Sequence, residues 1–216
     1  MVIDGLIQYL GLLVLLTFHE FGHAWMAWKC GDDTARLQGR VSLNPIVHID
    51  PIGTVVMPLL IIFLSMSGSG IAGFLIGWAK PVPVNLNNLR NPRMDDILVT
   101  LAGPWMNLLL AILIIGLARL GVAADSDSLV SICKTMAQLS LLLCFFNLLP
   151  IPPLDGSRIL RVLINMSYET YYQLARYGFI AVILVWQISA VRHLIVGVSN
   201  SALVVIENWF GMPPSI

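Results

Sequence analysis

The stretch LGLLVLLTFHEFGH, residues 10–23, carries the strongest structural signal in this sequence. It lies inside an apolar run at residues 3–28, which is long enough to cross a bilayer, since roughly 20 apolar residues suffice. The same run carries His19, Glu20 and His23 near its end. Ionisable side chains are costly within a span and rarely occur there without partners. The stretch therefore predicts a membrane-spanning helix that holds a polar site.

His19, Glu20 and His23 form the pattern HExxH. Residues four apart share one face of a helix, so the two imidazoles can bind one metal ion. The glutamate beside them can take a proton from a water that the metal activates. On a soluble surface helix this short pattern would indicate a zinc site and a solvated polar patch about equally. Within an apolar span, a metal that satisfies all three side chains is the favoured interpretation.

The composition indicates an integral membrane protein. Of the 216 residues, 57% are hydrophobic and 11% are charged, whereas soluble domains carry about 25% charged residues. The formal net charge is zero, so no nucleic-acid partner is expected. Cys30, Cys133 and Cys144 have no CxxC spacing and are interpreted as small apolar fillers rather than a disulfide framework.

The hydropathy pattern predicts an all-α membrane protein, with about four to six transmembrane helices in a single domain over residues 1–216. Further spans are expected at residues 97–120, 129–149 and 177–198, with a short apolar run at 52–66, a short helix at 157–165 and an interfacial segment at 202–209. Residues 29–50 predict a short β-hairpin, and residues 71–84 a re-entrant loop or buried strand near the active site.

The distribution of basic residues predicts the orientation. Lysine and arginine gather at residues 29–50, 80–96 and 150–165, whereas residues 121–128 have neither. The positive-inside rule places the three basic loops in the cytoplasm and the N-terminus outside. We therefore expect the polar site to lie towards the cytoplasmic side.

A catalytic zinc usually has three protein ligands and an open position for water, so HExxH lacks one ligand. The best candidate is Asp155, in the segment NLLPIPPLDG at residues 147–156. Its prolines interrupt a predicted span and Gly156 permits a tight turn, so Asp155 can point inward. Alternatively, Asp155 caps the following helix or lies in a simple turn. Beside an incomplete HExxH site, the ligand interpretation is favoured.

Three blocks of sequence together resemble the site-2 protease family of intramembrane metalloproteases. They are HEFGH at residues 19–23, SLNPIVHIDPIGT at 42–54 followed by GWAKPVPVN at 77–85, and AGPWMN at 102–107 followed by the 147–156 segment. The resemblance is to a minimal form without an inserted PDZ domain, because no polar segment is long enough to form one.

The resemblance implies one zinc ion held by His19, His23 and Asp155, with Glu20 as general base. It implies a metalloendopeptidase that hydrolyses peptide bonds in the transmembrane segment of membrane-anchored proteins, such as regulators already shortened by another protease. A bacterial or archaeal cell membrane is the expected location. The asparagines Asn107 and Asn147 match family asparagines near the catalytic site.

The roles of these two asparagines stay open. Their amides could hold the substrate carbonyl or stabilise the developing oxyanion. Asparagine within a span also commonly bonds a neighbouring helix, which would make Asn107 and Asn147 packing residues.

Two other functions use the same residues. A membrane metal-binding or transport protein would favour a continuous polar pathway, whereas the polar residues here cluster near one face. A non-catalytic scaffold that binds membrane helices needs no ligand set with a base. Residues 78–84 could pair with an extended substrate by strand addition or cover the site as a plug. His48 and Asp50 are expected to shape a proline-rich loop rather than to bind metal.

Overall fold

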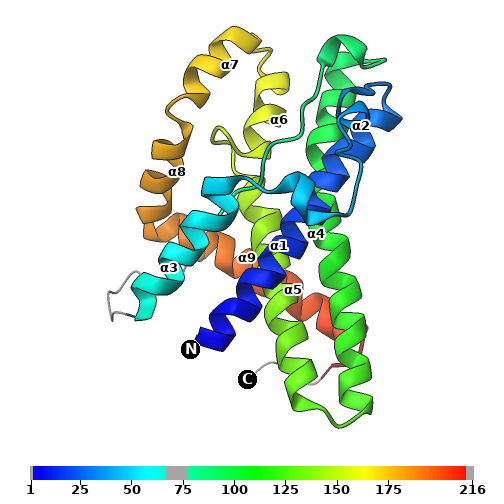
Figure 1. Cartoon of the computed structure of the whole chain (residues 1–216), viewed down its shortest axis with the longest axis vertical. Helices are drawn as coiled ribbons and strands as arrows, with labels where there is room; N and C mark the ends of the chain where they lie inside the picture. Colours follow the sequence, from blue (N-terminus) through cyan, green and yellow to red (C-terminus); the bar gives the residue numbers. More distant parts are fainter. Residues whose placement is uncertain (1, 67–76, 213–216) are drawn as a thin grey trace.

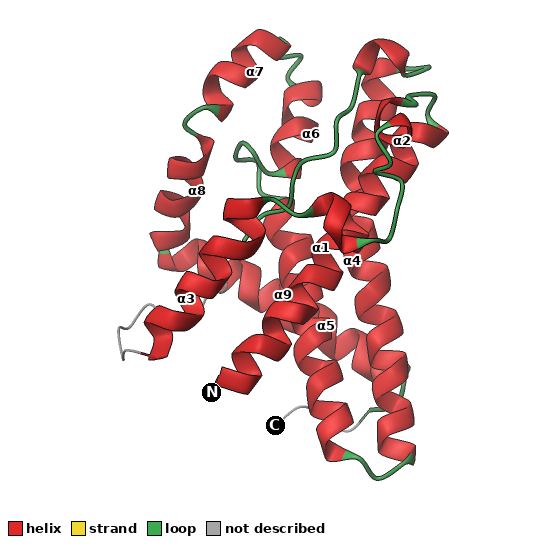
Figure 2. Ribbon diagram, viewed as in Figure 1, coloured by secondary structure: helices red, strands yellow, loops and turns green. Residues whose placement is uncertain are grey.

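The computed structural model describes residues 2–66 and 77–212 (Figure 1). Across these residues the regular structure is helical (Figure 2). The elements are α1 Val2–Lys29, α2 Thr34–Leu37, η1 Pro45–His48, η2 Pro51–Val56, α3 Met57–Met66, η3 Leu86–Asn88, α4 Pro92–Ala123, α5 Asp127–Asn147, α6 Asp155–Leu163, α7 Tyr168–Ala175, α8 Gly178–Gln187 and α9 Ser189–Trp209.

Four of the described helices are long and apolar enough to cross a membrane, which confirms the expected class of all-α membrane protein. They are α1 from Gly5 onward, α4, α5 and α9, and two shorter apolar helices lie at Pro51–Leu60 and Gly178–Gln187. The start of α4 shows how the sequence sets a boundary. The Asn91 side chain accepts from the Met94 N–H, Asp95 accepts from the Asn91 N–H, and Pro92 occupies the first helical position.

The core of the bundle forms where α4 packs along α5, and α9 closes one side (Figure 1). Small side chains line this contact on both helices, as in Ala111 and Ala118 of α4 and Ala137 of α5. Small residues let helix backbones approach closely, which is how helices associate where lipid removes the hydrophobic driving force. Leu109, Leu113, Leu117 and Leu120 are exposed on α4, as expected for a lipid-facing surface.

The last part of the chain differs from the expected span at residues 177–198. The helix breaks at Ile188, which adopts an extended backbone, so α8 ends at Gln187 and α9 begins at Ser189. The segment at 202–209, expected at the interface, is instead the continuous second half of α9. Hydropathy alone placed the span one helix too early because both sides of the break are apolar.

The predicted β-hairpin at residues 29–50 is wrong, since no strand occurs among the described residues (Figure 2). Local side-chain bonds fold this region into short helical turns. Asn44 accepts from the Ile46 N–H, and Asp50 accepts from the N–H groups of Ile52 and Gly53. These bonds give the backbone an alternative to a strand ladder.

Residues 77–84 have neither helical nor strand structure. The Trp78 N–H donates to the Gly53 carbonyl at 3.2 Å, and the Lys80 N–H donates to the His48 carbonyl at 2.9 Å. Two bonds therefore fix this segment against the η1–η2 region. Residues 71–76, the other part of the predicted re-entrant segment, lie outside the described residues.

Candidate metal centre

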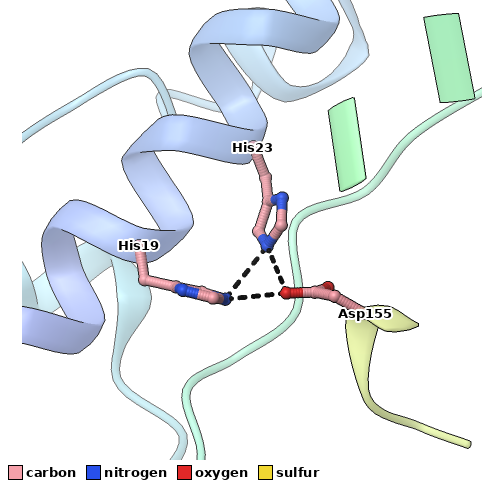
Figure 3. A group of neighbouring side chains, drawn as sticks. All are labelled: His19, His23 and Asp155. Carbon is pink, nitrogen blue, oxygen red and sulfur yellow. Dashed lines mark hydrogen bonds and ion pairs between the residues drawn. The ribbon is translucent and has the colours of Figure 1, made fainter. Parts of the chain in front are cut away.

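Three side chains from two distant helices meet at one point (Figure 3). His19 and His23 lie one turn apart on α1, and Asp155 is the first residue of α6. The Asp155 Oδ2 lies 3.1 Å from the His19 Nε2 and 3.3 Å from the His23 Nε2. The two Nε2 atoms are 3.1 Å apart. The structure therefore brings together the three residues that the sequence nominated as ligands.

The donor set and its dimensions fit a zinc ion. Ligands placed tetrahedrally at roughly 2.0–2.1 Å from zinc lie about 3.3 Å from one another, close to the three separations observed. All three residues are buried, and the Asp155 Oδ2 makes no hydrogen bond despite its short contacts. A buried carboxylate oxygen aimed at two imidazole nitrogens is costly unless a cation or protons balance it.

The local fold directs Asp155 towards the histidines. The cap of α6 is Leu154, with extended backbone and no side-chain capping bond, so the Asp155 carboxylate does not cap this helix. The next residue must be glycine, because a Cβ at Gly156 would lie 2.1 Å from the Leu148 carbonyl oxygen. The chain after α5 therefore folds back tightly enough to place Asp155 beside α1.

Helix α4 supports both imidazoles from behind. The His23 Nδ1 lies 2.7 Å from the Val99 carbonyl oxygen, and the His19 Nδ1 lies 3.2 Å from the Asn107 amide nitrogen. Between them, a Cβ at Gly103 would lie 2.4 Å from the His23 Nε2 and 2.7 Å from the His19 Cε1. Val99, Gly103 and Asn107 are four residues apart, so one face of α4 contacts both histidines.

An ion-pair cluster joins α4 to the helix that carries Asp155. The carboxylate of Asp96, which is fully buried, accepts from Arg158 and from Arg161 at 2.7 Å each. Both arginines lie on α6, one and two turns from its start. Sequence reasoning used the arginines only for orientation and missed this cluster. The signal was the pair Asp95 and Asp96 at the start of an apolar helix, because an aspartate that is buried there needs a cationic partner.

Glu20 follows His19 on α1 and is buried. Glu20 interacts electrostatically with His23 on the same helix, and with Arg40 and His48 in the following loop. The Arg40 guanidinium donates to the Lys80 carbonyl, which holds residues 77–84 beside this region. Burial lowers the pKa of His48, and its bond to the Ser42 carbonyl only partly offsets this effect. Glu20 thus lies at the junction of the metal group and the loop.

Of the other residues singled out in the sequence, one contacts the candidate metal group and the rest bond elsewhere. Asn107 contacts His19, one of the nominated ligands, whereas Asn147 donates to the Leu143 carbonyl of its own helix at 2.9 Å. His48 and Asp50 bond within their loop, to the Ser42 carbonyl and the N–H groups that follow Asp50. Within the described residues, neither belongs to the metal-binding group.

Comparison with known proteins gives the family. A sequence model of peptidase family M50 matches residues 7–123 and 114–186. A Bacillus subtilis protein named "Putative zinc metalloprotease YwhC" is 42% identical over 177 residues, covering 78% of this chain and 74% of that protein.

Two mycobacterial proteins, both named "Putative zinc metalloprotease Rip2", are more distant. The Mycolicibacterium smegmatis protein is 34% identical over 176 residues, covering 80% of this chain and 63% of that protein. The Mycobacterium tuberculosis protein is 36% identical over 146 residues, covering 68% of this chain and 52% of that protein. The chain thus spans less than two thirds of either mycobacterial relative. No solved structure matches.

The family match covers most of the chain, from α1 with its two histidines through α4 and α5 to α6 with Asp155. The matched residues include the elements that carry the candidate metal centre and the three sequence blocks on which the resemblance rested. The chain therefore belongs to peptidase family M50, the site-2 protease family.

Proposed function

We propose that this membrane-embedded zinc metalloprotease holds its metal with His19, His23 and Asp155, uses Glu20 as general base, and cleaves the transmembrane segments of membrane-anchored proteins. The observation that carries the proposal is the convergence of two imidazole nitrogens and one carboxylate oxygen at a buried point. Two histidines with one carboxylate leave one position of a tetrahedral zinc open, which is typical of catalytic rather than structural sites.

Zinc bound there would polarise the scissile carbonyl and lower the pKa of a water in the open position to about 7. The chain's own residues handle the proton. Glu20 takes a proton from the attacking water and delivers it to the leaving amine, a role that requires its carboxylate to lie within hydrogen-bond reach of both. Glu20 is buried, which keeps its proton away from bulk solvent between the two steps.

The arrangement of the helices supports a site towards the cytoplasmic side. Asp155 begins α6, and the basic residues Arg158 and Arg161 follow on the same helix. Under the positive-inside rule this end of the bundle faces the cytoplasm. Water would then enter from that side. A substrate helix must unwind locally, because helical backbone carbonyls are otherwise occupied by hydrogen bonds.

The ligands come from α1 and α6, and α4 contacts both histidines, so the site needs elements spread over much of the chain. This interleaving supports treating residues 1–216 as a single domain. The relatives named above are bacterial proteins, which supports a bacterial cell membrane as its location.

The test is cleavage of a single-span model substrate by purified, detergent-solubilised protein, comparing wild type with Glu20→Gln while measuring zinc content. We expect zinc in both proteins and cleavage by wild type alone, with the variant slower by roughly 100-fold or more. Zinc in both proteins, with no cleavage of several substrates that carry helix-breaking residues, would favour a metal-binding or transport function. Equal cleavage by both proteins would remove Glu20 from the mechanism.

A further inference from the structure

We propose that Asn107 is a positioning residue for the metal centre: its amide oxygen accepts a hydrogen bond from the His19 Nδ1–H and holds the tautomer that binds zinc through Nε2. This inference rests on the proposed metal site. It assigns Asn107 a role different from holding substrate or an oxyanion.

The geometry identifies which ring nitrogen of each histidine binds the metal. Both Nε2 atoms point at the Asp155 Oδ2, so they are the metal-binding atoms (Figure 3). A neutral imidazole that binds through Nε2 carries its proton on Nδ1, and this N–H needs an acceptor. Such acceptors set the orientation and basicity of metal-binding histidines.

For His23 the acceptor is evident. The Val99 carbonyl oxygen lies 2.7 Å from the Nδ1, and a backbone carbonyl can only accept a hydrogen bond. The His23 tautomer is therefore fixed by the backbone of α4. His19 contacts the same helix face two turns further on, at Asn107.

For His19 the amide presents its nitrogen to the Nδ1 at 3.2 Å, and the amide oxygen is buried without a partner. When Nδ1 carries a proton, as zinc binding requires, this orientation would set one donor against another. Rotating the amide by 180° exchanges its oxygen and nitrogen, which have nearly the same shape. The unpartnered oxygen then becomes the acceptor that the His19 Nδ1–H needs.

Burial keeps the Asn107 amide beside His19, since the side chain is fully buried between α4 and its neighbours. The Ser140 hydroxyl of α5 donates to the Asn107 backbone carbonyl at 2.7 Å, a bond that does not involve the amide. One turn earlier, Gly103 lies against both imidazoles. Helix α4 thus offers one acceptor to each histidine, a carbonyl at Val99 and an amide at Asn107.

The two roles considered for Asn107 need opposite ends of the amide. Holding a substrate carbonyl or an oxyanion requires the N–H donor, whereas orienting His19 requires the oxygen acceptor. An aspartate supplies only the acceptor and a leucine supplies neither. Zinc affinity then separates the roles independently of peptide cleavage.

The experiment measures zinc dissociation constants by chelator competition for wild type, Asn107→Asp, Asn107→Leu and Ser140→Ala. Ser140→Ala is the matched control, because it removes a buried hydrogen bond at the same residue but leaves the amide. We expect Asn107→Leu to bind zinc 10- to 100-fold more weakly, whereas Asn107→Asp and Ser140→Ala keep near wild-type affinity. If Asn107→Leu does not fold, Asn107→Ala takes its place, and we expect Asn107→Asp to bind zinc more tightly than Asn107→Ala.

Wild-type zinc affinity in Asn107→Leu or Asn107→Ala would overturn the proposal, and loss of cleavage with zinc retained would return Asn107 to the substrate-binding role. Equal weakening by Ser140→Ala would also overturn it, because general loosening would then explain the effect. Failure of the metal site itself is distinguishable, since wild type would not bind zinc at all.

Discussion

At the scale of single residues, the metal centre depends on a position that carries no side chain. Gly103 lies so close to both histidines that no Cβ fits without displacing an imidazole. The sequence nominated His19, His23 and Asp155 because imidazole and carboxylate side chains are recognisable as metal-binding groups, and the structure brings the three together. The sequence could not predict that Gly103 and the Val99 carbonyl support the two imidazoles. A glycine can occur for many reasons, and every residue has a backbone carbonyl, so neither feature can be recognised from residue type.

We predict that Gly103→Ala lowers zinc affinity at least tenfold and lowers cleavage with it, because a Cβ would lie 2.4 Å from the His23 Nε2. Chelator competition measures the affinity. Gly197→Ala is the control, since a Cβ there meets nothing within 4 Å, and it should behave as wild type. Unchanged zinc affinity in Gly103→Ala would contradict the packing described for α4.

At the scale of elements, α6 is held in place by charge rather than by apolar packing alone. Asp96 of α4 receives both Arg158 and Arg161, and the same helix α6 begins with Asp155. The sequence pattern predicted α6 to within two residues at each end. The prolines before this helix and its amphipathic composition are local signals, which a sequence pattern can detect. The contact with Asp96, 62 residues away from Arg158, is not local and was missed.

We predict that Asp96→Asn destabilises the protein by about 3–5 kcal/mol, because it leaves two largely buried guanidinium groups without a counter-charge. Zinc affinity should fall as well, since α6 carries Asp155. Asp33→Asn, which breaks the exposed pair with Arg36, should cost less than about 1 kcal/mol. Equal effects in the two variants, measured by thermal unfolding in detergent, would refute a structural role for the cluster.

A second element-scale contact joins the segment after α1 to the η3 region. Asp32 is fully buried and accepts from Thr34, the Asn85 N–H and the Asn88 amide. Burial alone would raise the pKa of Asp32, but these bonds outweigh it and lower the pKa below its ordinary value. A lowered folded-state pKa stabilises the protein above the ordinary carboxyl pKa of about 3.9, and this stability is lost as the pH falls further.

We therefore predict that the melting temperature of wild type falls below about pH 4, and that Asp32→Asn removes part of this dependence. At neutral pH the same variant should cost about 1–3 kcal/mol, because its amide N–H groups would face donors. Parallel pH profiles for wild type and Asp32→Asn would show that Asp32 contributes nothing to the acid transition.

The element-scale errors share a cause. The β-hairpin was inferred from alternating residues at 29–50, but side-chain caps at Asn44 and Asp50 favour short turns instead. The break at Ile188 was not predicted, because Ile188 is apolar like the helices on either side of it. Local polar bonds and single-residue backbone breaks are too small to alter a hydropathy average.

At the scale of the whole molecule, hydropathy was sufficient for the class of fold and for most span positions. A charge content of 11% excluded a water-exposed surface, and the four long helices follow from apolar runs of adequate length. The sequence predicted a range of four to six spans rather than one number. The two shorter apolar helices are as hydrophobic as a span but contain fewer residues than a span needs.

The orientation gives a prediction at this scale. A membrane-impermeant maleimide applied to intact cells should label Ala124→Cys, in the turn between α4 and α5, but not Leu37→Cys on α2. Both positions are exposed, and the native cysteines Cys30, Cys133 and Cys144 are buried, so background labelling should be low. Permeabilised cells should label both. The reverse pattern would invert the topology and place the metal centre towards the outer face.

The most direct test of the metal centre is zinc K-edge X-ray absorption of purified, zinc-loaded wild type and Asp155→Ala. The account predicts nitrogen and oxygen ligands at about 2.0–2.1 Å with the outer-shell signal of two imidazoles, and a changed first shell with weaker zinc binding in the variant. Sulfur scattering at about 2.3 Å, or a spectrum and affinity unchanged by Asp155→Ala, would contradict it.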